Sequence, residues 1–150
     1  MKAVWVLSIS IFLSPAVLAQ PKRIVFVCEH GSAKSVIAAT YFNKLAKEKN
    51  LPWVAVSRGT NPDSVVSPRT KQLLSSEGLL DNKLVPQKIM QTDIDGAQQV
   101  VLFWPLPESI QGKNRTRNWL EIQAVNNDYK KMRDDIVSRI TPMIDSLAKR

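Results

Sequence analysis

The sequence predicts one α/β domain of three layers, in which a four-stranded parallel sheet is flanked by helices. Short apolar runs rich in β-branched residues alternate with longer segments whose apolar residues recur at helical spacing. Strands that are separated by helices favour a parallel sheet with right-handed crossovers. A chain of 150 residues, 44% of them hydrophobic, is long enough to form one domain with its own core.

The first 19 residues differ from the rest in composition. Lys2 precedes a nearly continuous apolar run at 4–13, and compact residues follow at 17–19. This layout is typical of a secretory signal peptide, and the apolar run is short for a membrane span. An uncleaved anchor is the alternative. We expect a signal peptide at 1–19 and a mature domain at 20–150 that has no stable membrane span and is exported to the periplasm.

The elements of the domain follow from local patterns. Strands are predicted at 23–27, 53–57, 98–103 and 119–122, and helices at 35–49, 69–77, near 92–95 and at 127–149. After Arg23 the first strand is a continuous apolar run, as in a central strand that is covered on both faces. Ser67-Pro68 is typical of an N-cap followed by proline at the first helical position, and Gly78 is typical of a helix end.

The loop between the first strand and the first helix contains the candidate catalytic and oxyanion-binding residues. Cys28, the only cysteine, ends the strand, and Lys34-Ser35 open the helix after five further residues. Such a loop can turn its N–H groups toward one point, at a helix start that favours negative charge. Both features bind an oxyanion and lower the pKa of a thiol. The predicted oxyanion-binding residues are Glu29, His30, Gly31, Ser32, Ala33 and Lys34. The alternative is that Cys28 is only a small buried hydrophobe.

The run Val25-Phe26-Val27-Cys28 with Lys34-Ser35 resembles the active-site loop of the low-molecular-weight protein tyrosine phosphatases. The related thioredoxin-coupled arsenate reductases share that loop. Residues 54–60 and 129–149 are similar to the second strand and the last helix of the family, so the resemblance covers nearly the whole mature chain. It implies the fold of that family and cysteine-dependent hydrolysis of a phosphate monoester through a phosphocysteine.

The resemblance implies three catalytic residues. Cys28 is the expected nucleophile, and Ser35 is expected to donate its hydroxyl to the thiolate. Lys34 stands where the family has arginine, whose planar fork binds two phosphate oxygens, whereas lysine offers one mobile charge. We therefore expect weak activity. The alternatives are an ordinary N-cap for Ser35 and an exposed surface position for Lys34.

Two further loop residues need separate interpretation. His30, the only histidine, has three possible interpretations: a second cation at low pH, a hydrogen-bond donor within the loop, or a residue without a functional role. Glu29 is unusual beside an anion site, so its carboxylate is expected to point outward or to pair with Lys34.

No residue in the sequence is evident as the general acid. The family places Asp-Pro a few residues after a tryptophan, whereas here Trp119 is followed by Gln123 at that distance. Glutamine cannot donate a proton, and the loss of general acid catalysis costs about 10²- to 10⁴-fold in rate. The nearby candidates are Glu121 and Asp128, each of which is otherwise a solvated surface residue.

Four other residues are candidates for the site. Arg58, Arg115 or Arg117 could supply the missing guanidinium fork, and Trp104 could form a wall of a pocket. The alternatives are exposed charges for the arginines and a core-edge position for the tryptophan.

The net charge and the single cysteine limit which binding partners and which reactions can be expected. The net charge is +8, but the cations are scattered without an aromatic-interleaved stripe, so no nucleic acid is expected. The expected partner is phosphate, arsenate, another oxyanion or a phosphorylated substrate, and neither a metal nor a cofactor is expected. Three functions stay open: a cysteine phosphatase, a non-catalytic oxyanion-binding protein, and an arsenate reductase that uses an external thiol such as glutathione. An internal disulfide relay is impossible with one cysteine.

Overall fold

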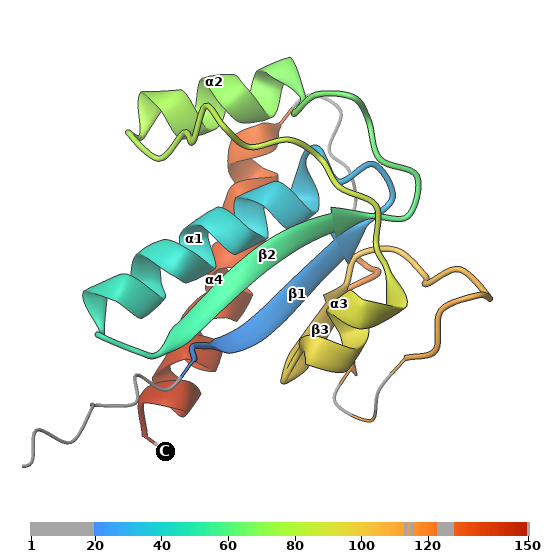
Figure 1. Ribbon diagram of the computed structural model, residues 1–150. Helices are drawn as coiled ribbons and strands as arrows, with labels where there is room; N and C mark the ends of the chain where they lie inside the picture. Colours follow the sequence, from blue (N-terminus) through green and yellow to red (C-terminus); the bar gives the residue numbers. More distant parts are fainter. Residues whose placement is uncertain (1–19, 113, 115, 123–127, 150) are drawn as a thin grey trace, which may run out of the picture.

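The computed structural model describes residues 20–112, 114, 116–122 and 128–149, so the predicted signal peptide at 1–19 lies outside the described residues. The elements are β1 (Lys22–Cys28), α1 (Lys34–Glu48), β2 (Trp53–Gly59), α2 (Pro68–Ser76), α3 (Gln91–Gly96), β3 (Gln99–Leu102), β4 (Thr116–Asn118) and α4 (Tyr129–Ala148). The strands form one parallel sheet in the order β2-β1-β3-β4 (Figure 1). The predicted four-stranded α/β fold is confirmed.

Helices cover both faces of the sheet (Figure 1). α1, α2 and α4 pack on one face, and α3 packs on the other. Side chains alternate along β1, so Ile24, Phe26 and Cys28 face the larger helical layer, while Val25 and Val27 face α3. All five are buried. The central position of β1 in the sheet therefore explains why its sequence is apolar from Ile24 to Cys28, whereas Lys22 and Arg23 at its start are exposed.

The predicted helix ends around α2 are confirmed. Ser67 Oγ accepts a hydrogen bond from the N–H of Thr70 at 3.2 Å, and Pro68 begins the helix. Gly78, just beyond the last turn, has φ +68°, a backbone conformation that glycine adopts without steric cost. Within the described residues, no helix has the length and apolar character needed to cross a membrane.

The prediction of a strand at 119–122 is wrong. β4 ends at Asn118, and residues 119–122 form a turn that leaves the sheet. Trp119 is buried against the rings of Phe26 and Phe103, at centroid distances of 6.2 and 5.7 Å. Ile122 is also buried. These residues are apolar because they cover the carboxyl end of the sheet, a tertiary contact that resembles a strand pattern over so short a run.

Candidate active site

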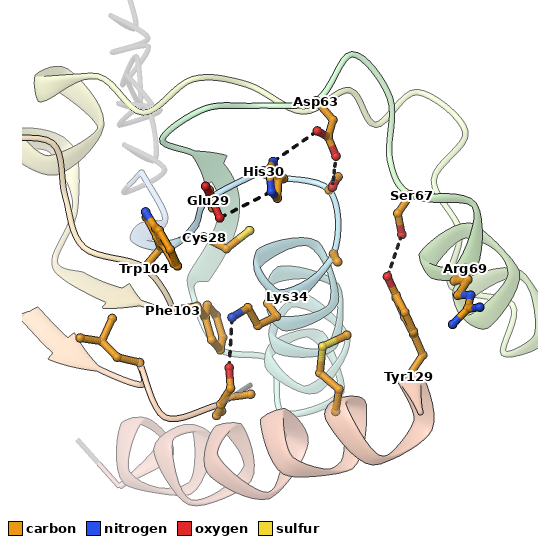
Figure 2. Close-up of a pocket in the computed structure, with 15 residues that line it drawn as sticks. Cys28, Glu29, His30, Lys34, Asp63, Ser67, Arg69, Phe103, Trp104 and Tyr129 are labelled. Atoms are coloured by element: carbon orange, nitrogen blue, oxygen red, sulfur yellow. Dashed lines mark hydrogen bonds and ion pairs between the residues drawn. The ribbon is translucent and has the colours of Figure 1, made fainter. Parts of the chain in front are cut away.

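A cavity of about 680 Å³ opens at the carboxyl end of β1 (Figure 2). Its lining residues come from the loop after β1, the segment between β2 and α2, the ends of β3 and β4, and the start of α4. They are Cys28, Glu29, His30, Ser32, Ala33, Lys34, Asp63, Ser67, Arg69, Phe103, Trp104, Leu120, Ile122, Tyr129 and Met132. Parallel α/β folds bind ligands at this edge of the sheet.

The sulfur of Cys28 lies in this cavity with two hydrogen-bonding partners. The N–H of Gly31 donates to Sγ at 3.2 Å, and Ser35 Oγ lies 3.0 Å from the same sulfur. Cys28 is 3% exposed and Ser35 is fully buried. Ser35 is not the N-cap of α1, because Ala33 holds that position and has no side-chain cap. The Ser35 hydroxyl is therefore a hydrogen-bonding partner of the sulfur, and Cys28 is not packed only among hydrocarbon groups.

The loop after β1 is bonded on its outer side to the segment that follows β2. The carbonyls of Cys28, Glu29 and His30 accept from the N–H groups of residues 60, 61 and 63 at 3.0, 2.8 and 3.0 Å. The described chain has no cis peptide bond, so each following N–H points the opposite way from its carbonyl. The N–H groups of residues 29–31 are thereby turned away from the outer segment, and that of Gly31 reaches Sγ.

Lys34 is the first residue of α1 and lines the cavity. Its ammonium donates to the carbonyl of Ile122 at 3.0 Å and lies 6.0 Å from the centre of the Phe103 ring. Half-burial lowers the pKa of Lys34, and the negative charges of Cys28 and Glu29 oppose this shift. The alternative of an exposed surface lysine is therefore wrong. The side chain holds a positive charge in the cavity and also anchors the turn at 119–122.

His30 lies between two carboxylates (Figure 2). Its Nε2 is 3.5 Å from Oε2 of Glu29, and its Nδ1 is 3.4 Å from Oδ1 of Asp63. Ser32 Oγ donates to the other oxygen of Asp63 at 2.6 Å. Glu29 was expected to point outward or to pair with Lys34; its closest ionic partner is instead His30.

Arg58 does not supply the missing guanidinium fork. Its Nη2 lies 2.8 Å from Oδ1 of Asp93, and both side chains are largely buried. The cause is strand alternation: Arg58 pairs in register with Val27, whose side chain faces α3, whereas Cys28 faces the other helical layer. Arg117 is exposed on β4 and does not line the cavity. Arg115 lies outside the described residues.

The two predicted proton donors near Trp119 are not in the cavity either. Glu121 is exposed and accepts a hydrogen bond from Arg139 at 2.6 Å. A backbone N–H and Arg139 lower the pKa of Glu121, which keeps it ionised. Asp128 is the N-cap of α4 and accepts from the N–H of Lys131 at 2.9 Å. Both candidates are therefore wrong, and Gln123 lies outside the described residues.

Several cavity residues were not anticipated from the sequence. Asp63, Arg69 and Tyr129 line the cavity, although no sequence pattern assigned them to the site. The place of Asp63 at the site could have been predicted, because it follows the strand next to β1. Loops at the carboxyl ends of adjacent parallel strands lie close together. Trp104 was anticipated as a wall, and it lines the cavity with 44% of its surface exposed.

Comparison with known proteins agrees with this geometry. The family model described as low molecular weight phosphotyrosine protein phosphatase matches residues 23–104, which include the whole Cys28 loop. The chain belongs to this family. The suspected resemblance is thus confirmed. A comparison with the curated proteins found no match.

Three solved structures illustrate the similarity of the fold. A low molecular weight protein tyrosine phosphatase from T. tengcongensis is 20% identical, with a TM-score of 0.72, and the match covers 83% of this chain and 99% of that one. The YwlE arginine phosphatase from Geobacillus stearothermophilus is 22% identical, with a TM-score of 0.68 and coverage of 86% and 94%. A thioredoxin-dependent arsenate reductase from Corynebacterium glutamicum is 19% identical, with a TM-score of 0.72; the match covers 87% of this chain but only 64% of the reductase.

Proposed function

We propose that this chain hydrolyses phosphate monoesters with Cys28 as the nucleophile. The observation that carries the proposal is the sulfur in the cavity, with the Gly31 N–H and the Ser35 hydroxyl within hydrogen-bond distance. These partners can stabilise a thiolate. The thiolate attacks phosphorus as the ester oxygen leaves, and water then releases phosphate from the phosphocysteine.

The rest of the cavity suits such a substrate. The N–H groups of residues 29–31 and the Lys34 ammonium supply positive partners for phosphate oxygens. Phe103, Trp104 and Tyr129 give the cavity aromatic walls, which favour an apolar or aryl group on the ester oxygen. The substrate class proposed is therefore an aryl or protein-bound phosphate.

The test is hydrolysis of p-nitrophenyl phosphate by the purified protein and by its Cys28→Ser variant. We expect slow turnover that is lost in the variant, because serine lacks the thiolate. Equal, near-zero rates would exclude the phosphatase function. Lys34→Arg should raise the rate by providing a bidentate fork, with Lys44→Arg, exposed on α1, as the matched control.

A non-catalytic oxyanion-binding protein is the second candidate. It is favoured by Lys34, whose ammonium lines the cavity and attracts an oxyanion but lacks the planar fork with which arginine holds two phosphate oxygens. Binding of phosphate or arsenate without turnover would select this function. Arsenate reduction with an external thiol would instead appear as glutathione-dependent formation of arsenite.

We also propose that the protein is exported through the segment at 1–19, as its composition suggests. Cell fractionation followed by N-terminal sequencing of the mature protein tests this proposal. Cleavage after Ala19 is the expected result, and retention of Met1 on a cytosolic protein would contradict it.

A further inference from the structure

The proposed hydrolysis needs a proton for the oxygen that leaves the phosphorus, and it must come from a group near Cys28. The described cavity lining contains few titratable candidates besides the nucleophile: Glu29, His30, Lys34, Asp63, Arg69 and Tyr129. Arginine does not release its proton at neutral pH, and the hydroxyl of Tyr129 lies 3.4 Å from Ser67 Oγ, its partner at the start of α2 (Figure 2). The ammonium of Lys34 is the cation required for phosphate, and it is already bonded to a carbonyl.

Glu29, His30 and Asp63 remain, and they form one connected chain (Figure 2). The imidazole of His30 has a carboxylate oxygen 3.4 or 3.5 Å from each of its nitrogens. Asp63 is fixed at the far end by the Ser32 hydroxyl, and the peptide N–H of Asp63 donates to the carbonyl of His30 at 3.0 Å. The imidazole is thus oriented by Asp63 and faces Glu29.

Glu29 is the member of this chain that directly follows Cys28 in the sequence. It lines the same cavity, and its side chain is about 39% exposed, so it is accessible to a bound substrate. His30 and Asp63 are exposed to a similar degree. Although the three side chains are close, no group of His, Cys, Asp or Glu within the described residues has the arrangement of a metal site.

We propose that Glu29 and His30 share the proton that this reaction transfers, with Glu29 as the group that meets the leaving oxygen. As the Cys28 Sγ–P bond forms and the P–O bond breaks, the leaving ester oxygen keeps the electron pair and takes a proton from Glu29. His30 then passes a proton to Glu29. In the second step water attacks phosphorus, gives its proton back to the Glu29–His30 pair, and the S–P bond breaks to restore the thiolate. Each cycle consumes one water and leaves the pair unchanged. Asp63 is a positioning residue for His30.

This inference rests on the proposed phosphatase function, and the experiment separates the two. Rates are measured with p-nitrophenyl phosphate, whose phenol leaves without help, and with phenyl phosphate, whose weakly acidic phenol needs a proton. Glu29→Gln should lower the rate on phenyl phosphate about a hundredfold and that on p-nitrophenyl phosphate by less than about tenfold. Glu48→Gln, an exposed carboxylate at the other end of α1, is the matched control.

His30 is tested by chemical rescue. His30→Ala should slow phenyl phosphate hydrolysis, and added imidazole should restore part of the rate, which a purely structural role would not allow. Circular dichroism verifies that each variant is folded. An equal loss on both esters, a gain on both, or no rescue overturns the inference while the phosphatase function stands. A wild-type protein that hydrolyses neither ester overturns both.

Discussion

Gly31, in the loop after β1, and Gly59, at the end of β2, lie back to back with no room for a side chain on either. A Cβ on Gly59 would lie 2.8 Å from the Gly31 nitrogen, and one on Gly31 would lie 3.0 Å from the Gly59 nitrogen. Gly31 also has φ +60°. This contact allows the loop after β1 to lie directly against the end of β2, and so it sets the position of the Gly31 N–H beneath the sulfur of Cys28.

Gly59→Ala should therefore disturb both stability and the site. The new methyl meets backbone atoms that cannot rotate away, so we expect a loss of about 2 kcal/mol in the free energy of unfolding. Thermal unfolding measures this, and slower alkylation of Cys28 by iodoacetamide reports the displaced loop. Gly96→Ala is the control, because a Cβ there has nothing within 4 Å. If Gly59→Ala is as stable as Gly96→Ala, the tight contact is refuted.

Ser35→Ala should make Cys28 less reactive while leaving the fold intact. The hydroxyl is buried 3.0 Å from Sγ, and a hydrogen bond to a charged partner contributes about 1.5–3 kcal/mol. We expect at least a tenfold drop in the alkylation rate at pH 7 and in turnover. Ser138→Ala, an exposed hydroxyl on α4, serves as the control. An unchanged alkylation rate would show that Ser35 does not support the thiolate.

Anion binding should weaken at alkaline pH because Lys34 loses its charge there. Burial lowers the pKa of its ammonium below the ordinary 10.5, so the charge is lost at a lower pH than for an exposed lysine. An anion binds the charged form, and sulfate keeps its own charge throughout this range. Affinity for sulfate should therefore be full at neutral pH and should fall as the pH rises through the lowered pKa.

Calorimetry of sulfate binding in a Cys28→Ser background measures this without interference from the thiol. The same background with Lys34→Arg is the comparison, because arginine stays charged. Its affinity should remain constant over the range where that of the lysine protein falls. Parallel curves for the two proteins would mean that Lys34 does not hold the anion.

The buried pair of Arg58 and Asp93 should be structural. Asp93→Asn keeps a side-chain oxygen for the N–H of Met90 but leaves the guanidinium without its charge partner, at a cost of about 3 kcal/mol. Urea unfolding measures the loss, and Asp95→Asn on the exposed side of the same helix is the control. Sulfate affinity per folded molecule should stay unchanged. A loss of affinity without a loss of stability would instead place Arg58 in the anion site.

The sequence by itself determined three of the four strands, most of the helices and the position of Cys28 at the end of a strand. These depend on local properties: β-branched runs form strands, Ser67-Pro68 and Gly78 delimit a helix, and Cys28 stands where a strand meets a helix start. The motif around Cys28 also identified the family, which the match over residues 23–104 confirmed.

Only the tertiary structure decided which side chains complete the site. Lys34 meets Ile122, 88 residues away, and Ser32 meets Asp63, 31 residues away. The direction of Arg58 depended on which face of the sheet each helix covers. The segment at 119–122 turns over the sheet end after the N–H of Trp119 has bonded the carbonyl of Leu102. Such contacts form between residues that no local pattern connects, because packing of whole elements brings them together.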